Sequence, residues 1–302
     1  MQRLFSHLLT ERPFSIHKRR DAWFRAGCRP FSEGTGGMPV RRIVGIIAII
    51  AGVLSFICGS LGYLDGPLFA FAPASQTAPA SHQRLAVVFL SGDMGLNVGI
   101  EPQVAAQLAS NGIPVLSINS LYYFRVTRAP AEIERLIAGG IRRALVFGHA
   151  DRVVLIGYSF GADMLHTGLA SLPLALRGKV VMTALIVPSD TVQFRSSPSE
   201  VFSFMEPQYD ALATARKLDW VPGLCIYGIR EESSLCKQLT LPRFHSIGLP
   251  GGHLLHRDAN AVYRELIDAI NKVTNNSGSA HVPVKRGHAV QHFGASRSEI
   301  DT

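Results

Sequence analysis

Short apolar runs rich in β-branched residues alternate along residues 85–272 with longer segments whose apolar residues recur at helical spacing. Runs of the first kind are typical of buried strands, and segments of the second kind are typical of amphipathic helices. The pattern predicts strands at about 85–91, 113–118, 152–157, 180–187, 223–228 and 244–249. It predicts helices at about 102–111, 130–147, 160–171, 206–217 and 258–272. This alternation predicts an α/β domain with a mostly parallel sheet and helices on both faces.

A different pattern precedes this domain. Residues 43–64 form an uncharged apolar stretch of 22 residues that follows Arg41 and Arg42, which is long enough to cross a bilayer as a helix. The arginines predict that its N-terminal side is cytoplasmic. The stretch is either a retained transmembrane anchor or the apolar segment of a signal peptide whose true start is Met38, with small-residue cleavage sites near Ala72 or Ala74.

Both alternatives place the domain outside the cytoplasm, and we expect a periplasmic protein that is either released or anchored in the inner membrane. Residues 1–42 are then a basic cytoplasmic arm or a leader upstream of the true start, and residues 65–84 a linker with prolines and small residues. Residues 273–302 are polar and without periodicity, which predicts a disordered tail.

The net charge of +8 comes mainly from the arm. Residues 1–42 hold nine Lys and Arg against three Asp and Glu, whereas the other 260 residues hold 21 against 19. A nearly neutral body argues against nucleic acid as a partner. With 47% hydrophobic and 17% charged residues, the chain can bury a large core.

Export changes the reading of the cysteines. Only Cys225 and Cys236 belong to the body, and in an oxidising compartment their spacing fits a disulfide across a ten-residue loop. Two unrelated buried thiols are the alternative that the sequence leaves open.

The motif Gly157-Tyr158-Ser159-Phe160-Gly161 lies between a predicted strand and a predicted helix. Gly-x-Ser-x-Gly in that setting is typical of a nucleophile elbow, in which the serine hydroxyl projects from a sharp turn. By itself the pattern also fits an ordinary turn, because glycine and serine are common there.

A serine nucleophile needs a base and an acid that orients the base. In this topology the acid precedes the histidine, and each follows a strand. Glu231 and Glu232 follow the predicted strand 223–228, and His253 follows the strand 244–249. We therefore predict a triad of Ser159, Glu231 and His253, with Glu232 as the alternative acid.

Two loops are candidates for an oxyanion hole. The backbone N–H of Phe160, directly after the serine, would be one donor. Asp93 or Met94, in the loop after the first strand of the domain, would supply the other. The alternative is an ordinary Gly-Asp turn.

Five segments in this order resemble the bacterial VirJ/AcvB virulence-protein family: SGDMG, SINSLYYFRVTRAP, LIGYSFGAD, CIYGIREESSLC and LPGGH. The resemblance covers about residues 85–272 and implies an α/β-hydrolase fold, export to the periplasm and, for some members, hydrolysis of aminoacyl-phosphatidylglycerol. It supports Ser159 as nucleophile and His253 as base, and it places the acid in the loop between the two cysteines.

The sequence thus predicts a serine hydrolase that cleaves an ester, and the resemblance implies that the substrate is the aminoacyl ester of a membrane lipid. Such a mechanism needs no metal and no cofactor. The alternatives are a binding or assembly factor of a secretion system, with a secretion-system partner, and a general carboxylesterase or thioesterase.

An aminoacyl lipid carries an ammonium group near the ester, so its pocket should hold a carboxylate outside the triad. Asp163, four residues after the serine, is the first candidate and Asp93 is the second. Asp163 also fits a first-turn acid that the helix dipole favours. Tyr123 and Phe124 are candidates for the lipid side of the pocket, although aromatic residues there also fit a core.

Overall fold

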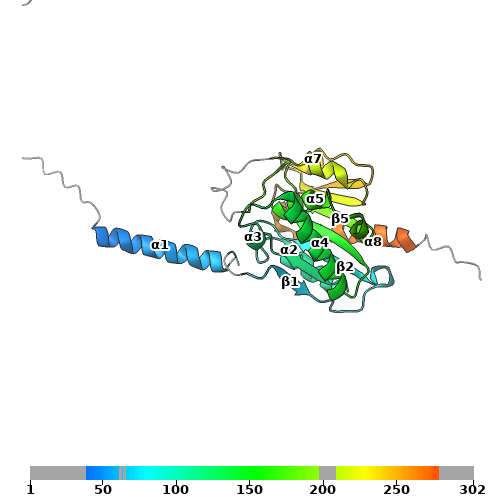
Figure 1. The fold of residues 1–302 in the computed structure, drawn as a ribbon, viewed down its shortest axis with the longest axis horizontal. Coiled ribbons are helices and arrows are strands. Elements are labelled where there is room, and N and C mark those ends of the chain that lie inside the picture. The colour runs from blue at the N-terminus through cyan, green and yellow to red at the C-terminus, as the bar shows by residue number, and fades with distance from the viewer. Residues whose placement is uncertain (1–38, 61–62, 64–65, 197–208, 279–302) are drawn as a thin grey trace, which may run out of the picture. The chain divides into compact units, whose positions relative to one another are not determined.

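The computed structural model describes residues 39–60, 63, 66–196 and 209–278. A seven-stranded sheet forms the centre of the folded body, in the order β1-β3-β2-β4-β5-β8-β9 (Figure 1). Its strands are β1 (Phe69–Ala72), β2 (Leu85–Leu90), β3 (Val115–Ile118), β4 (Arg152–Tyr158), β5 (Val180–Ile186), β8 (Gly223–Gly228) and β9 (Phe244–Leu249). From β3 to β9 every neighbouring pair is parallel, whereas β1 runs antiparallel to β3. A separate two-stranded pair consists of β6 (Thr191–Val192) and β7 (Tyr209–Asp210).

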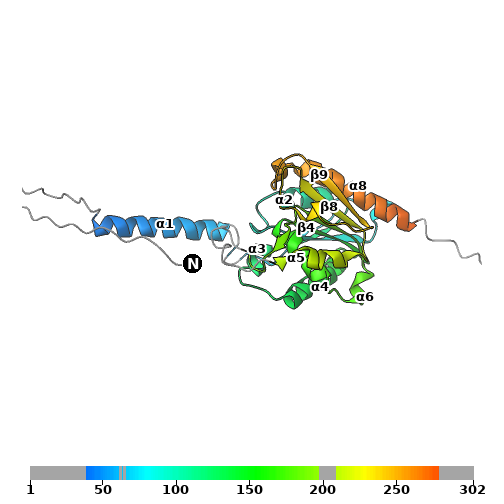
Figure 2. The ribbon, with the colours of Figure 1, turned by 90° about the horizontal axis from the view of Figure 1, so that it is seen from above.

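Helices cover both faces of the sheet, as the continuous apolar strands require. On one face, α4 (Pro130–Phe147) and α5 (Phe160–Leu169) pack against the strands. On the other face lie α2 (Glu101–Ser110) and α8 (Ala259–Gly278), and Figure 2 shows the two layers on either side of the sheet. Strand β2 contributes alternate residues to the two cores and is buried along its whole length. The short helices are α3 (Ser120–Tyr123), α6 (Leu174–Arg177) and α7 (Leu212–Ala215).

The order of the strands creates a switch point. The chain passes from β2 through α2 to β3, and then through α4 to β4 on the opposite side of β2. The loops after β2 and β4 therefore diverge at one edge of the sheet. In open α/β sheets, ligands bind in the crevice that such a divergence leaves outside the carboxyl ends of the strands.

The segment predicted as a linker, residues 65–84, contains structure that the composition did not indicate. Residues 69–72 form the edge strand β1, because four residues suffice to pair with β3 from Phe69 opposite Ile118 to Ala72 opposite Val115. A short 3₁₀ turn, Ala80–His82, follows and carries the buried side chain of His82. Part of the expected linker thus belongs to the sheet.

The other elements differ from expectation mainly at their ends. Helix α8 continues to Gly278, into the segment predicted as a disordered tail, and the rest of that tail lies outside the described residues. The helix expected at 206–217 is reduced to α7 and a 3₁₀ turn, Arg216–Leu218, while 206–208 lie outside the described residues.

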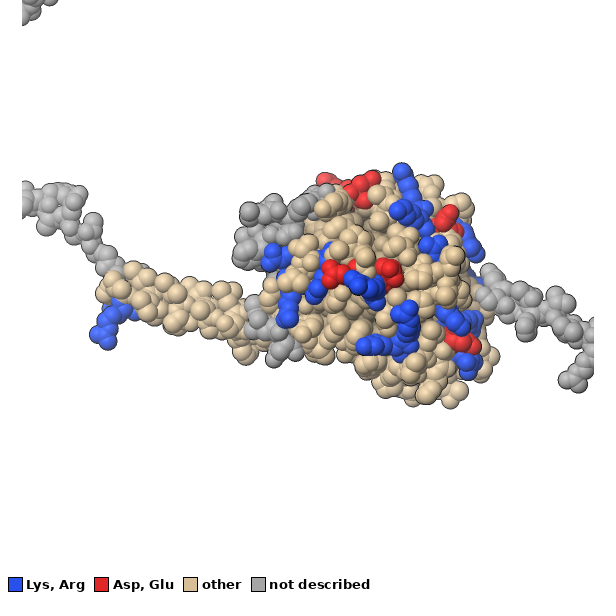
Figure 3. Space-filling view, in the orientation of Figure 1, with Lys and Arg blue, Asp and Glu red and all other residues tan. Residues whose placement is uncertain are grey.

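Helix α1 (Val40–Ser60) contains most of the predicted apolar segment. Its window Val40–Ile57 is long and apolar enough to cross a membrane, judged by length and composition. Arg41 and Arg42 are its only charged residues. Figure 3 shows basic side chains at one end of this helix and none along the rest of it. On the face of the body shown there, basic and acidic side chains are interspersed.

Candidate active site

Ser159 occupies a sharp turn between β4 and α5. Its backbone lies in a region that residues with a Cβ rarely adopt, with φ of 53° and ψ of −126°. Both glycines of the motif are needed for close packing. A Cβ on Gly157 would lie 2.6 Å from the Ala162 Cα, and one on Gly161 would lie 2.3 Å from the Ser91 carbonyl oxygen. The turn is therefore a nucleophile elbow in geometry.

His253 and Glu231 meet Ser159 at this edge of the sheet. The Ser159 Oγ lies 2.7 Å from the His253 Nε2. On the far side of the ring, the His253 Nδ1 lies 2.6 Å from the Glu231 Oε1. The ring is thus held between the hydroxyl and the carboxylate, which is the arrangement in which a histidine can take a proton from a serine.

The structure distinguishes the two glutamates of the acid loop. Glu231 has a side chain that is only 8% exposed, and its Oε2 accepts a hydrogen bond from the Gly228 N–H at 3.3 Å. The Lys237 ammonium also donates to the Glu231 carbonyl oxygen. Glu232 is exposed and does not reach His253. Of the two candidates, only Glu231 contacts the histidine.

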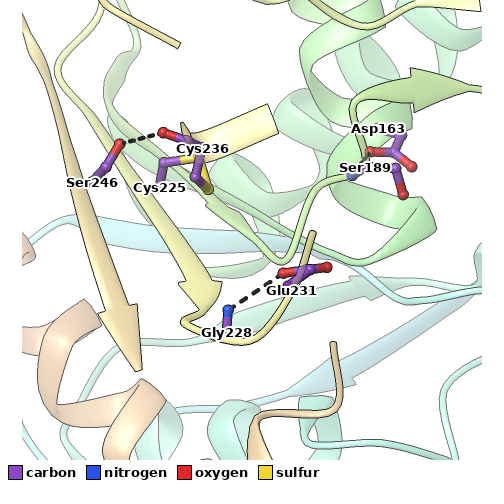
Figure 4. Close-up of a disulfide and its surroundings, with 7 residues drawn as sticks. All are labelled: Asp163, Ser189, Cys225, Gly228, Glu231, Cys236 and Ser246. Carbon is purple, nitrogen blue, oxygen red and sulfur yellow. Dashed lines mark hydrogen bonds between the residues drawn. A yellow bond between two sulfur atoms is a disulfide. The ribbon is translucent and has the colours of Figure 1, made fainter. Parts of the chain in front are cut away.

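A disulfide closes the loop that carries Glu231. Cys225 in β8 is bonded to Cys236, with a Cα–Cα distance of 5.5 Å (Figure 4). The Ser246 hydroxyl of β9 donates to the Cys236 carbonyl oxygen at 3.1 Å, so the far end of the loop is also tied to the neighbouring strand. The structure therefore contains the disulfide that the spacing predicted.

A cavity of about 340 Å³ opens beside the serine and the histidine. Its volume is at the lower end of the range for small-molecule pockets. It lies between the loops after β2 and β4, at the switch point of the sheet, and the loop after β9 completes it. Its lining residues are Gly92, Asp93, Met94, Val98, Gly99, Tyr158, Ser159, His253, Leu254 and Arg257.

The predicted oxyanion loops both reach the site. Asp93 and Met94 line the cavity, and Phe160 is the first residue of α5, where backbone N–H groups have no partner within the helix. Ser196 donates a hydrogen bond to the Asp93 carbonyl oxygen at 3.2 Å, which helps to hold this loop in place.

Asp163 lies outside the cavity. The side chain is buried in α5, and its Oδ1 accepts a hydrogen bond from the Ser189 N–H at 2.9 Å (Figure 4). Burial raises the pKa of this carboxyl well above its usual range, while the hydrogen bonds from Ser189 act in the opposite direction. Asp163 thus ties α5 to the loop after β5, and it does not line the cavity beside Ser159.

Tyr123 and Phe124 also lie outside the cavity. Phe124 is fully buried and packs edge-on against Phe160, with ring centroids 5.2 Å apart. Tyr123 packs against Phe124, and the Arg128 guanidinium lies 4.5 Å from its ring centroid. Both rings belong to the packing behind the elbow, because Phe124 is part of the core that α4 and α5 cover and Tyr123 packs against that core.

Several cavity residues were not identified from the sequence. The Tyr158 ring packs over Gly99, where a Cβ would lie 3.1 Å away, and thereby supports the loop after β2. Burial raises the Tyr158 pKa; the Asp93 carboxylate raises it further, and the Arg257 charge lowers it. The serine motif contained the available signal for Tyr158, because this residue directly precedes the nucleophile.

Metal binding finds no support in residues 39–60, 63, 66–196 and 209–278. No group of three or more His, Cys, Asp or Glu side chains there could hold an ion. The polar side chains that line the cavity are those of Asp93, Tyr158, Ser159, His253 and Arg257.

The parallel sheet with its antiparallel edge strand, the elbow after β4 and the chain order Ser159, Glu231, His253 define an α/β-hydrolase fold. Within that fold class, the chain belongs to the family of the bacterial virulence protein VirJ, whose family model matches residues 84–274. This confirms the resemblance to VirJ that the five segments carried.

Solved structures resemble the chain at low sequence identity. A lipase from Bacillus licheniformis is 10% identical, with a TM-score of 0.48, over 67% of this chain and 97% of that one. An α/β-hydrolase from Penicillium sp. sh18 is 12% identical, with a TM-score of 0.49, over 68% and 93%. A proline iminopeptidase from Mycobacterium smegmatis is 12% identical, with a TM-score of 0.46, over 69% and 95%. No curated protein matches the sequence.

Proposed function

We propose that this protein is a serine hydrolase that cleaves a carboxylic ester through an acyl-enzyme on Ser159. The observation that carries the proposal is the continuous contact from the Ser159 Oγ to the His253 Nε2, at 2.7 Å, and from the His253 Nδ1 to the Glu231 Oε1, at 2.6 Å. The strained backbone of Ser159 also supports the proposal, because such strain is concentrated at functional sites and is not expected of an ordinary surface serine.

The reaction would proceed in two steps. In the first, the Ser159 Oγ attacks the ester carbonyl carbon while His253 takes the hydroxyl proton. The tetrahedral intermediate collapses, the ester oxygen leaves as an alcohol with the proton from His253, and the acyl group remains on Ser159. In the second, His253 removes a proton from water while the water oxygen attacks the acyl carbon; the bond to the Ser159 Oγ then breaks, His253 returns the proton to that oxygen, and the free acid departs.

Glu231 supports both steps without changing protonation state. It accepts the hydrogen bond of the Nδ1–H, which fixes the tautomer that leaves the Nε2 free to receive a proton. Its negative charge stabilises the imidazolium that forms in each step. The backbone N–H of Phe160, with that of Asp93 or Met94, would bind the oxyanion, which is an electrostatic contribution made by donors already in position.

For the substrate, we propose the aminoacyl ester of aminoacyl-phosphatidylglycerol, with a lysyl or alanyl group. Membership of the VirJ family supports this class, as does a cavity large enough for a headgroup but too small for two acyl chains. Asp93 replaces Asp163 as the candidate for the substrate ammonium, because Asp93 lines the cavity. Helix α1 and the disulfide support a periplasmic location beside the inner membrane.

The test uses the full-length protein in detergent micelles. Strand β1 is part of the sheet, and a truncated chain that begins at residue 75 would lack it. Wild type, Ser159→Ala and Ser110→Ala are incubated with lysyl- and alanyl-phosphatidylglycerol, and free amino acid is measured. Ser110 is an exposed serine at the end of α2 and serves as the matched control. We expect release by wild type and Ser110→Ala, and a loss of at least about 10³-fold in Ser159→Ala.

Two results would contradict the proposal at different levels. Release by Ser159→Ala at the wild-type rate would exclude the acyl-enzyme. Activity on simple acyl esters without any release from the aminoacyl lipids would keep the hydrolase and replace the substrate with that of a general esterase.

A further inference from the structure

Arg257 is a cation in the wall of the candidate active site that the triad mechanism does not use. It lines the same cavity as Ser159 and His253. Its backbone N–H donates to the Leu254 carbonyl oxygen at 2.7 Å. In the part of the chain that the structure describes, its guanidinium has neither a hydrogen-bond partner nor an acidic partner.

Three other arginines of the body differ from Arg257 because their guanidinium groups have a partner or lie outside the cavity. The Arg84 guanidinium is bonded to Asp151 at 2.7 Å, and that of Arg128 is bonded to Glu132 at 3.2 Å. The Arg230 guanidinium lies 3.4 Å from the His256 ring and does not line the cavity. Arg257 combines an unpaired charge with a position beside the nucleophile.

An unusual turn places Arg257 there. Leu255, His256 and Arg257 have φ values of 47°, 52° and 58°, so three consecutive residues with a Cβ lie in the left-handed region. This conformation is unfavourable for such residues and persists only where the surroundings impose it. Runs of this kind concentrate at functional sites.

Contacts on both sides of the turn hold it. The Leu255 N–H donates to the Gly252 carbonyl oxygen at 2.9 Å, and the Asp258 N–H donates to that of Leu255 at 3.0 Å. The Leu255 side chain is buried in the core under α8. The turn begins two residues after His253 and brings residue 257 back to the cavity that His253 lines.

We propose that Arg257 binds the phosphodiester of the substrate headgroup while the ester carbonyl lies against Ser159. This inference rests on the proposed function, because it concerns the substrate of the same cavity. A guanidinium offers parallel N–H donors that match two phosphate oxygens, and such charge-assisted pairs are stronger than neutral hydrogen bonds. In a phosphatidylglycerol ester, one glycerol unit separates the phosphate from the reacting ester, so both groups fall within one headgroup-sized cavity.

The proposal predicts the direction in which the headgroup binds in the cavity. Asp93 and Arg257 exert opposite electrostatic effects on Tyr158, so carboxylate and guanidinium both act on one wall of the cavity. A headgroup with an ammonium on the aminoacyl side and a phosphate on the lipid side would be oriented by these two charges. The ester lies between the ammonium and the phosphate, so it would then be presented to Ser159 in a single orientation.

The experiment compares two lipids that carry the same aminoacyl ester in the same mixed micelles. One is lysyl-phosphatidylglycerol, and the other is lysyl-diacylglycerol, which lacks the phosphate. The full-length proteins are wild type, Arg257→Gln, Arg257→Lys and Arg264→Gln, and the last removes an exposed arginine of α8 outside the cavity as a charge-matched control. Labelling of Ser159 by a fluorophosphonate probe reports whether the triad is intact.

We expect Arg257→Gln to lower kcat/KM for the phosphodiester lipid by about 10- to 100-fold, mainly through KM, and to change the neutral lipid less than about twofold. Arg257→Lys should recover part of the loss because it keeps the charge but not the planar fork. Arg264→Gln should match wild type on both lipids.

An equal loss on both lipids would assign Arg257 to the support of the histidine loop and overturn the inference. No loss on either lipid, or faster hydrolysis of the neutral lipid by wild type, would overturn it too. In each of these cases the hydrolase stands, because probe labelling and turnover remain dependent on Ser159. Turnover that persists in Ser159→Ala would instead remove the proposed function.

Discussion

Glu101 provides the sharpest test of how burial sets the electrostatics of this fold. It is the first residue of α2, the residue is 2% exposed, and its Oε1 accepts a hydrogen bond from the Ser117 hydroxyl of β3 at 2.6 Å. The Glu101 Oε2 is buried and has no hydrogen-bond partner among the described residues. Burial therefore raises the pKa of Glu101 from 4.5 to about 7, and the Ser117 hydrogen bond only partly offsets it.

The sign and size of the effect follow from this shift. Between pH 4.5 and about 7 the folded protein keeps a proton on Glu101 that the unfolded chain has released, so the free energy of unfolding falls as the pH rises. Each unit of pKa shift corresponds to about 1.4 kcal/mol, so the whole shift amounts to about 3 kcal/mol. The penalty is complete above pH 7 and absent below pH 4.5.

The variant Glu101→Gln removes this penalty. A glutamine stays neutral at every pH, and its side-chain oxygen can still accept the Ser117 hydrogen bond. Relative to wild type, we expect Glu101→Gln to gain about 3 kcal/mol in the free energy of unfolding on going from pH 4.5 to pH 8. Denaturation by guanidinium chloride, followed by tryptophan fluorescence in the same micelles at both pH values, measures this difference.

Glu134→Gln on α4 is the matched control, because it makes the same chemical change at a partly exposed position outside the core. Comparing each variant with wild type cancels the titration of the other groups, which are common to all three proteins. If Glu101→Gln differs from wild type by the same free energy at both pH values, Glu101 does not carry a buried charge at pH 8, and the reasoning from burial is wrong.

Three further predictions concern α5 and the acid loop. Burial lowers the pKa of His166 to about 3, so the free energy of unfolding falls as the pH falls from 6.5 toward 3. A His166→Gln variant should therefore lose less stability than wild type between pH 7 and pH 4, measured by urea denaturation. Equal losses in the two proteins would contradict this. The Cys225–Cys236 bridge should appear as joined peptides in mass spectrometry of the unreduced protein, and replacing both by serine should lower the free energy of unfolding by about 3 kcal/mol; two free thiols would refute it. Gly161→Ala should abolish fluorophosphonate labelling of Ser159, because the added Cβ meets the backbone at 2.3 Å; undiminished labelling would show that the elbow can open to accommodate it.

The parts of the fold that the sequence predicted well are those that local patterns determine. The runs that form β4, β8 and β9 are continuous and bounded by polar or glycine-containing turns, so their ends agree with expectation within one or two residues. Because the carboxyl ends of parallel strands share one edge, the order of Ser159, Glu231 and His253 was enough to predict that these three side chains meet. The structure brings them together as that order predicted.

The remaining features depend on contacts that a single sequence does not reveal. Strand β1 is only four residues long and gains its structure from pairing with β3, which its own composition cannot indicate. Asp163 lies on the face of α5 that turns toward Ser189, and the helical pattern alone could not tell this face from one that lines the cavity. Phe124 follows a strand, as a pocket residue would, but its ring completes the core.

The position of Arg257 in the cavity wall could not be predicted from the sequence for a related reason. A left-handed turn over three residues with a Cβ has no local signal, since none of Leu255, His256 and Arg257 favours that conformation. The pattern of the region resembles an ordinary helix start, as the predicted helix from residue 258 assumed. Only the tertiary contacts of the histidine loop determine which way the chain turns.

Strand β1 bears on how the protein could be processed during export. Cleavage after Ala72 or Ala74 would cut the chain directly behind the last pair of β1 and β3 and release the strand as part of the leader. The edge of β3 would then present unpaired N–H and C=O groups, which in other sheets recruit strands from further molecules. A protein matured at either position would therefore be prone to self-association, whereas a chain that keeps residues 69–72 covers its own edge and carries helix α1 with it.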